Sequence, residues 1–248
     1  AISTLVVVNR IEGDSQDASS PRTIPLKDKR ITILVWEVSG NLNFKIDADG
    51  KSYVIRLAGE GTEQLGIKRD VEHTANKAAG ELCIAPEVYY FIEPEGYIVT
   101  RFVSGKHITP EDIVKPDYLS RIANKLRLFH TRGPKLNGEF NVFKRVEMLT
   151  KVSKANNSKF PHDWDFIMQK MNEVKKALDK DPYKPTPCHN DLLNLNWLDE
   201  EAAGDIGEIR LLDWEYAGMG DIFFDLGNFS HHHRLSEEQV RFFLNEYF

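Results

Sequence analysis

The segment CHNDLLNLNWL, residues 188–198, holds an Asp and, five positions later, an Asn. A second apolar run, IRLLDW at 209–214, places another Asp near its end. Phosphoryl transfer needs a carboxylate that orients or deprotonates the attacking hydroxyl, and it needs oxygen ligands for Mg²⁺. Asp191, Asn196 and Asp213 have the chemical types and the order for these tasks. Taken singly, residues of these types are more typical of turn caps, loop carboxylates or a charged surface.

Composition limits the classes of protein that fit. The chain has 248 residues, is 41% hydrophobic and carries a formal net charge of −6. This length supports one large domain or two smaller lobes, and the absence of basic excess argues against a nucleic-acid or membrane-surface partner. The chain has only two cysteines, Cys83 and Cys188, so we expect no disulfide framework and a reducing, cytoplasmic compartment. The opening run AISTLVVVNR is too short an apolar stretch to cross a bilayer.

The first part of the chain reads as β-rich. Residues 11–30 are polar, with two prolines, and predict a loop. Asp49-Gly50 between two β-rich runs is a hairpin turn signal, and the residues after it change to a helical period. The expected strands lie at 31–38, 41–47, 52–58, 87–92 and 96–103, and the expected helix lies at 64–80.

After Gly105 the character becomes mostly helical. Apolar residues recur at helical spacing in 117–132 and 163–179, and a final helix is expected from about Ser236. Short apolar runs at 194–198 and 209–214 lie between them. The sequence therefore predicts an α+β chain of two lobes: a small antiparallel β-rich lobe with one helix at 1–103, and a larger, mostly helical lobe at 104–248.

The two central runs also carry a family pattern. CHNDLLNLNWL followed by IRLLDWEYAGMGDIFFDLGN resembles the choline/ethanolamine kinase and aminoglycoside phosphotransferase superfamily, which shares the protein-kinase-like fold. The family pattern is H-x-D-x-x-x-x-N, then a strand ending in D-[FW]-E, then D-x-[GA], and each position is filled here. The resemblance covers roughly residues 30–248. It implies a kinase that uses ATP and Mg²⁺.

The resemblance also assigns roles to residues of the second lobe. It makes Asp191 the catalytic base, and it makes Asn196 and Asp213 the Mg²⁺ ligands. His189 would brace the catalytic loop without taking part in the chemistry. Asp225 matches an acidic residue that supports that loop in the family.

On the nucleotide side, the resemblance implies that Arg56 on the third strand, paired with Glu72 on the following helix, holds phosphate oxygens. Ser39 and Asn41, beside Gly40, stand where the phosphate-covering loop is expected, although an ordinary hairpin turn is an equal alternative. Thr100–Val103 would contact adenine through the backbone.

On the acceptor side, Glu215 and Tyr216 of DWEY resemble the D-F-E-Y of choline kinases and are expected near the amine. Trp214, between Asp213 and Glu215, should point into the core. The chain departs from eukaryotic choline kinases after Gly227-Asn228: those kinases continue H-F-C-E-W, with an acid and a Trp near the amine, whereas this chain reads FSHHH at 229–233. The expected acceptor is a small amino alcohol, choline or ethanolamine. An aminoglycoside or other small metabolite, or a pseudokinase that only binds nucleotide, remains as an alternative.

The triplet His231-His232-His233 invites a metal interpretation. Adjacent residues on a helix point in different directions and do not converge on one ion. We therefore expect the triplet at the polar start of a helix.

Overall fold

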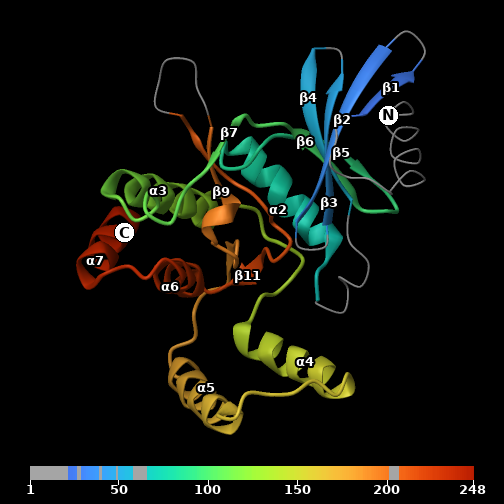
Figure 1. Ribbon diagram of the computed structural model, residues 1–248. Helices are drawn as coiled ribbons and strands as arrows, with labels where there is room; N and C mark the ends of the chain where they lie inside the picture. The colour runs from blue at the N-terminus through green and yellow to red at the C-terminus, as the bar shows by residue number, and fades with distance from the viewer. Residues whose placement is uncertain (1–21, 27–28, 39–40, 49, 58–65, 201–206) are drawn as a thin grey trace. The chain divides into compact units, whose positions relative to one another are not determined.

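A computed structural model describes residues 22–26, 29–38, 41–48, 50–57, 66–200 and 207–248 (Figure 1). The chain divides into two compact units. The first comprises residues 1–60 and 88–102, and the second comprises 61–87 and 103–248. Where the structure describes the chain, no helix has both the length and the apolar character to cross a bilayer.

The first unit is built on a six-stranded antiparallel sheet with strand order β1-β2-β3-β4-β6-β5. Gly50, with φ 74°, lies between β3 and β4 and adopts a backbone conformation that glycine accepts readily. The strands are β1 (Arg22–Leu26), β2 (Lys29–Val38), β3 (Asn41–Ala48), β4 (Lys51–Leu57), β5 (Val88–Ile92) and β6 (Tyr97–Arg101).

Alternation along β3 and β4 creates the core of this unit. Phe44 of β3 pairs with Ile55 of β4, and Ile46, Leu57 and Val99 of β6 belong to the same buried cluster. Period-two burial of this kind is what a half-buried strand requires. The expected loop at 11–30 is wrong from Arg22 onward, because β1 pairs with β2 residue by residue despite Pro25. Proline is compatible with this edge strand, since β1 has one partner.

The second unit combines helices with short strand pairs. Strand β9 lies between β10 and β7, and β11 pairs with β8, all antiparallel. Helices α3 and α7 pack side by side (Figure 1). The helices are α2 (Arg69–Glu81), α3 (Pro116–Arg132), α4 (Val142–Ala155), α5 (Trp164–Leu178), α6 (Ile222–His232) and α7 (Glu237–Tyr247). The strands are β7 (Gly105–His107), β8 (Thr186–Cys188), β9 (Trp197–Glu200), β10 (Ile209–Leu211) and β11 (Gly218–Gly220).

Helix α2 belongs with the second unit. Its Val71, Ala75 and Ala79 lie in the same buried cluster as the α3 residues Ile122 and Leu126. The expected lobe boundary at 103 had placed this helix in the first lobe. The division differs because a helix groups with the element against which its apolar face packs, which the linear order of elements does not reveal.

The helices that the apolar pattern predicts are present. Those expected at 117–132 and 163–179 are α3 and α5, and the last one begins at the N-cap Ser236, which forms a capping box with Gln239. Two further helices, α4 and α6, were not expected. The histidine triplet lies at the end of α6 and not at a helix start, because Asp221 caps the helix by accepting from Phe223 N.

Candidate active site

One buried carboxylate, that of Asp225, holds the start of the loop that follows β8. Asp225 of α6 is fully buried, and its two oxygens accept from the backbone N–H groups of His189 at 2.9 Å and Asn190 at 2.7 Å. His130 Nε2 lies 3.1 Å from the same carboxylate. Two backbone donors and a histidine satisfy this buried acid, so its position fixes the start of the loop.

His189 connects the loop to the end of β10. Its ring is fully buried, and Nε2 donates to the Leu212 carbonyl at 2.9 Å, while Nδ1 accepts from Asp191 N at 3.2 Å. The donated hydrogen places the proton on Nε2 and leaves Nδ1 as an acceptor. The side chain thereby joins the backbone of Asp191 to the residue that precedes Asp213.

Asp191 and Asn196 lie at the two ends of one tight turn. Asn196 Nδ2 donates to the Asp191 carbonyl at 2.8 Å and to Asp191 Oδ2 at 3.1 Å. The 3₁₀ turn Asn194–Asn196 leads directly into β9. Because the amide nitrogen is committed to Asp191, the amide oxygen of Asn196 is the atom left to accept or to coordinate.

Asp213 is brought to the same place by the β9–β10 hairpin. Leu211 pairs with Trp197 in register, and Leu212 N donates to the Asn196 carbonyl at 2.8 Å. Asp213 then adopts φ 62°, a left-handed conformation that is uncommon for a residue with a side chain. Such conformations persist where the surrounding structure enforces them and are concentrated at functional sites.

The electrostatics of Asp191 follow from this arrangement. Burial raises the pKa of the Asp191 carboxyl, and the charge of Asp213 raises it further. His189 and the hydrogen bond from Asn196 act in the opposite direction. A carboxylate with a raised pKa is a better acceptor for a proton that leaves a substrate.

An amide oxygen and a carboxylate oxygen, from Asn196 and Asp213, fit the hard-oxygen coordination that Mg²⁺ prefers. The hydrogen bond from the Asn196 nitrogen to Asp191 orients the Asn196 side chain, and Asp213 adopts its left-handed backbone conformation nearby. On chemistry and geometry, the two residues suit a Mg²⁺ site completed by water and phosphate.

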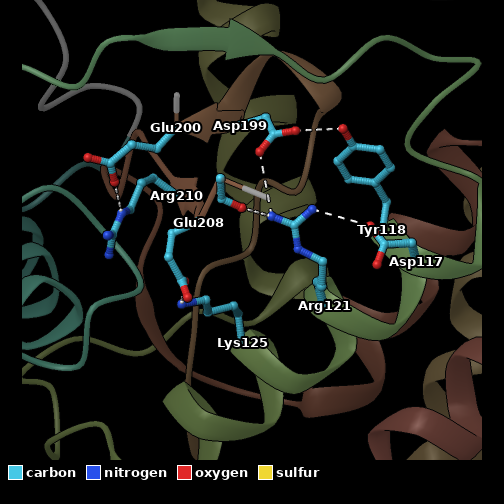
Figure 2. Close-up of polar contacts among 9 residues, drawn as sticks. Asp117, Tyr118, Arg121, Lys125, Asp199, Glu200, Glu208 and Arg210 are labelled. Atoms are coloured by element: carbon cyan, nitrogen blue, oxygen red, sulfur yellow. Dashed lines mark hydrogen bonds and ion pairs between the residues drawn. The ribbon is translucent and has the colours of Figure 1, made fainter. Parts of the chain in front are cut away.

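The distal part of the β9–β10 hairpin is attached to α3 by polar contacts. Figure 2 shows Asp199 of β9 between two α3 side chains: Tyr118 donates to one oxygen at 2.6 Å, and Arg121 lies 3.5 Å from the other. Arg121 also donates to the carbonyl of Gly207. Arg210 Nε of β10 donates to Glu200 at 2.6 Å across the same hairpin. These contacts fix the element whose base carries the two candidate metal ligands.

The acceptor-side residues follow directly after Asp213. Trp214 is 1% exposed and lies in the core, as the sequence predicted. Glu215 is also buried, with a carboxylate oxygen 3.9 Å from Arg69 of α2. Arg69 in turn donates to Glu72 at 2.5 Å. Tyr216 is partly exposed, its carbonyl accepts from Asn190 Nδ2 at 3.0 Å, and its ring lies under the guanidinium of Arg145.

The residues predicted to bind the nucleotide belong to both units of the chain. Arg56 lies on β4 of the first unit, opposite Asn43 and Ile98, and Glu72 lies on α2 of the second unit. Their pairing stays a prediction. Ser39 lies outside the described residues. Asn41 begins β3, and its side chain lies outside the described part.

Sequence reasoning missed the residues that act through other residues. His130 and Tyr247 extend the Asp225 network, with His130 Nδ1 2.7 Å from the Tyr247 hydroxyl. His130, Cys188 and Asp225 have metal-ligand types close together, but both oxygens of Asp225 already accept backbone hydrogen bonds. Burial raises the pKa of the Cys188 thiol, which keeps it neutral, so this cluster is best described as a hydrogen-bonded support.

Known proteins share this architecture. The family described as choline/ethanolamine kinase matches residues 31–241. A LicA homolog from Metamycoplasma hominis is 29% identical over 157 residues, which cover 63% of this chain and 59% of that protein. A choline/ethanolamine kinase family protein from Mesorhizobium loti is 26% identical in sequence, with a TM-score of 0.71 over 87% of this chain and 68% of that one. The choline kinase LicA from Streptococcus pneumoniae shares the fold at 21% identity, with a TM-score of 0.74 over 98% of this chain and 79% of that one.

The fold is the α+β protein-kinase-like fold of small-molecule phosphotransferases, as the sequence predicted. Within that class, the chain belongs to the choline/ethanolamine kinase family. It spans about 60% of the length of the curated relatives that it matches first.

Proposed function

We propose that this chain carries an ATP- and Mg²⁺-dependent kinase activity that phosphorylates the hydroxyl of a small amino alcohol, choline or ethanolamine. The observation that carries the proposal is the convergence of Asp191, Asn196 and Asp213, with Asn196 bonded to Asp191 and the Asp213 charge acting on Asp191. Membership of the choline/ethanolamine kinase family supports the class of acceptor.

In this proposal Asp191 orients the acceptor hydroxyl and takes its proton. The hydroxyl oxygen forms a bond to the terminal phosphorus of ATP, the bond from that phosphorus to the ADP oxygen breaks, and ADP departs with the electron pair. Mg²⁺, when bound, would neutralise phosphate charge, with Asn196 and Asp213 as its protein ligands. His189 and Asp225 keep the loop rigid, so that little reorganisation is needed during transfer.

The remaining assignments rest on the same resemblance. Arg56, held by Glu72, would contact phosphate oxygens, and the segment with Ser39 and Asn41 would cover them. Glu215 and Tyr216 would lie beside the amine. The contact between Glu215 and Arg69 also supports a structural role for this acid, and the ATP and acceptor KM values of Glu215→Gln would separate the two roles.

A panel of acceptors tests the proposal. The purified protein is incubated with Mg·ATP and choline, ethanolamine or an aminoglycoside, and the phosphorylated product is identified by mass spectrometry. We expect phosphorylation of at least one amino alcohol. Asp191→Asn should lower kcat by about 10²–10⁴-fold while ATP binding persists. Turnover of the aminoglycoside alone would replace the acceptor class, and ATP binding with no product from any acceptor would indicate a pseudokinase.

A further inference from the structure

The aromatic ring of Tyr216 lies against a positively charged side chain of this same chain. The guanidinium carbon of Arg145, on α4, lies 4.5 Å from the centroid of the Tyr216 ring, within the range of a cation–π contact. The same guanidinium lies 5.5 Å from the ring of Phe140. Arg145 therefore contacts two aromatic rings and lies over one face of Tyr216.

Tyr216 belongs to the surroundings of the catalytic loop. Its carbonyl accepts from Asn190, the neighbour of Asp191, at 3.0 Å. Burial and the adjacent Glu215 raise the pKa of the Tyr216 hydroxyl, Asp191 adds to this, and Arg145 opposes it. Asp191 and Arg145 thus both act on Tyr216, and all three lie in the second unit.

The two candidate amines depend on an aromatic face to different degrees. A quaternary ammonium has no N–H, so it binds through charge and through contact of its methyl groups with aromatic faces. A primary ammonium has three N–H donors and can be held by carboxylates and carbonyls. A guanidinium on Tyr216 repels both cations, but it removes a binding surface only from the quaternary one.

Resting on the proposed function, we propose that Arg145 is a specificity-determining residue that selects a primary amino alcohol over a quaternary one. It does so by occupying the face of Tyr216 that a trimethylammonium group would need. Helix α4 supplies this residue, and the described side chains of α4 include none that is fully buried, so a substitution at Arg145 does not remove core packing.

The test compares Arg145→Met with Lys144→Met, its neighbour on α4. Lys144 is exposed and is paired with Glu139 at 2.8 Å. For each protein, kcat/KM is measured for choline and for ethanolamine, together with the KM for ATP. The parent should prefer ethanolamine. Arg145→Met should raise kcat/KM for choline about five- to thirtyfold, the value of one cation–π contact, with the KM for ATP unchanged. Lys144→Met should behave as the parent does.

The other outcomes distinguish an error in the role of Arg145 from an error in the proposed kinase activity. A choline-to-ethanolamine ratio that stays within twofold of the parent in Arg145→Met, or a fall in choline efficiency, overturns the role of Arg145 while leaving the kinase assignment intact. A parent that phosphorylates neither amine overturns the proposed function, and this inference with it. Arg145→Gln removes the charge by a second route and should shift the ratio in the same direction. Melting temperatures verify that both variants are folded.

Discussion

At the residue scale, the site depends on single polar atoms whose partners lie far away in sequence. Asp225 accepts hydrogen bonds from the backbone N–H groups of Asn190 and His189, which lie 35 and 36 positions earlier in the sequence. Its third partner, His130, lies 95 positions earlier. The motif pattern indicated Asp191, Asn196 and Asp213 because their chemical types follow one another in short segments. His130 and Arg145 have no such local pattern, since their partners are determined by packing. Sequence alone therefore predicts the chemistry of the site better than its supports.

Asp225 is the support whose loss should be most costly. In Asp225→Asn, one oxygen becomes an NH₂ group that faces a backbone donor of His189 or Asn190, and a buried charge-assisted network is broken. We expect a loss of about 3–5 kcal/mol in the free energy of unfolding, measured by urea denaturation, together with loss of transfer activity. Asp221→Asn on the same helix is the matched control, because Asn also caps a helix N-terminus, and it should stay within about 0.5 kcal/mol. Equal stability of the two variants would contradict the support role.

The partly buried side chain of His233 should make the free energy of unfolding depend on pH. Burial lowers its pKa to about 4, and the ring of His232, 4.8 Å away, adds to this. The hydrogen bond from Nε2 to the Leu192 carbonyl, at 3.0 Å, acts in the opposite direction. The unfolded state, with a pKa near 6.5, therefore binds a proton that the folded state does not bind between about pH 6.5 and 4. Stability is present above this window and is lost as pH falls through it.

The measurement is the free energy of unfolding at pH 7 and pH 5 in the parent and in His233→Gln, which keeps a donor but does not titrate. The parent should lose about 1 kcal/mol more than the variant over this interval, after allowance for partial solvent screening. The difference between the two proteins isolates the contribution of His233. Parallel losses in the two proteins would refute the role of His233.

At the element scale, the β9–β10 hairpin is the unit that brings the two candidate metal ligands together. The sequence showed short apolar runs at 194–198 and 209–214, and the family resemblance implied a strand that ends at Asp213. The attachment of the hairpin to α3 through Asp199 was not predictable, since charged residues on a helix face are most often simply solvated. Helix α4 was missed although apolar residues recur along it at helical spacing, namely Val142, Val146, Leu149 and Val152.

Two α3 side chains share Asp199, so their substitutions should be coupled. Tyr118→Phe removes a donor at 2.6 Å and should cost about 1 kcal/mol, whereas Arg121→Met also leaves the Gly207 carbonyl without this donor and should cost about 1–3 kcal/mol. The double variant should deviate from additivity by at least about 0.5 kcal/mol in urea denaturation. Lys170→Met, which removes an exposed pair with Glu173, is the control and should change stability by less than about 0.5 kcal/mol. Strict additivity would mean that the two side chains act independently of Asp199.

At the scale of the whole molecule, the chain forms two units with separate cores, and the candidate chemistry lies in the second. The sequence predicted two lobes because the hydrophobic period changes from two to about 3.6 along the chain. It placed α2 differently, since the core to which a helix contributes is a property of the folded chain. A ligand that binds only the folded protein stabilises it by mass action, so binding at the site can be read from the stability of the molecule as a whole.

Stabilisation by bound Mg·ATP tests whether Asp213 is a metal ligand. ATP with Mg²⁺ at about one hundred times its Kd should stabilise the parent by about 2.7 kcal/mol, a rise in Tm of about 5–10 °C for a chain of this size. Asp213→Asn keeps the shape and tolerates the left-handed backbone at φ 62°, but it removes the charge of one ligand. Its Tm should rise much less with Mg·ATP, and a higher Mg²⁺ concentration should be needed to recover the shift, whereas Asp221→Asn should respond as the parent does. A Mg²⁺ titration of Asp213→Asn that overlays the parent would remove Asp213 from the metal site, because a carboxylate ligand cannot be neutralised without weakening its hold on a divalent cation.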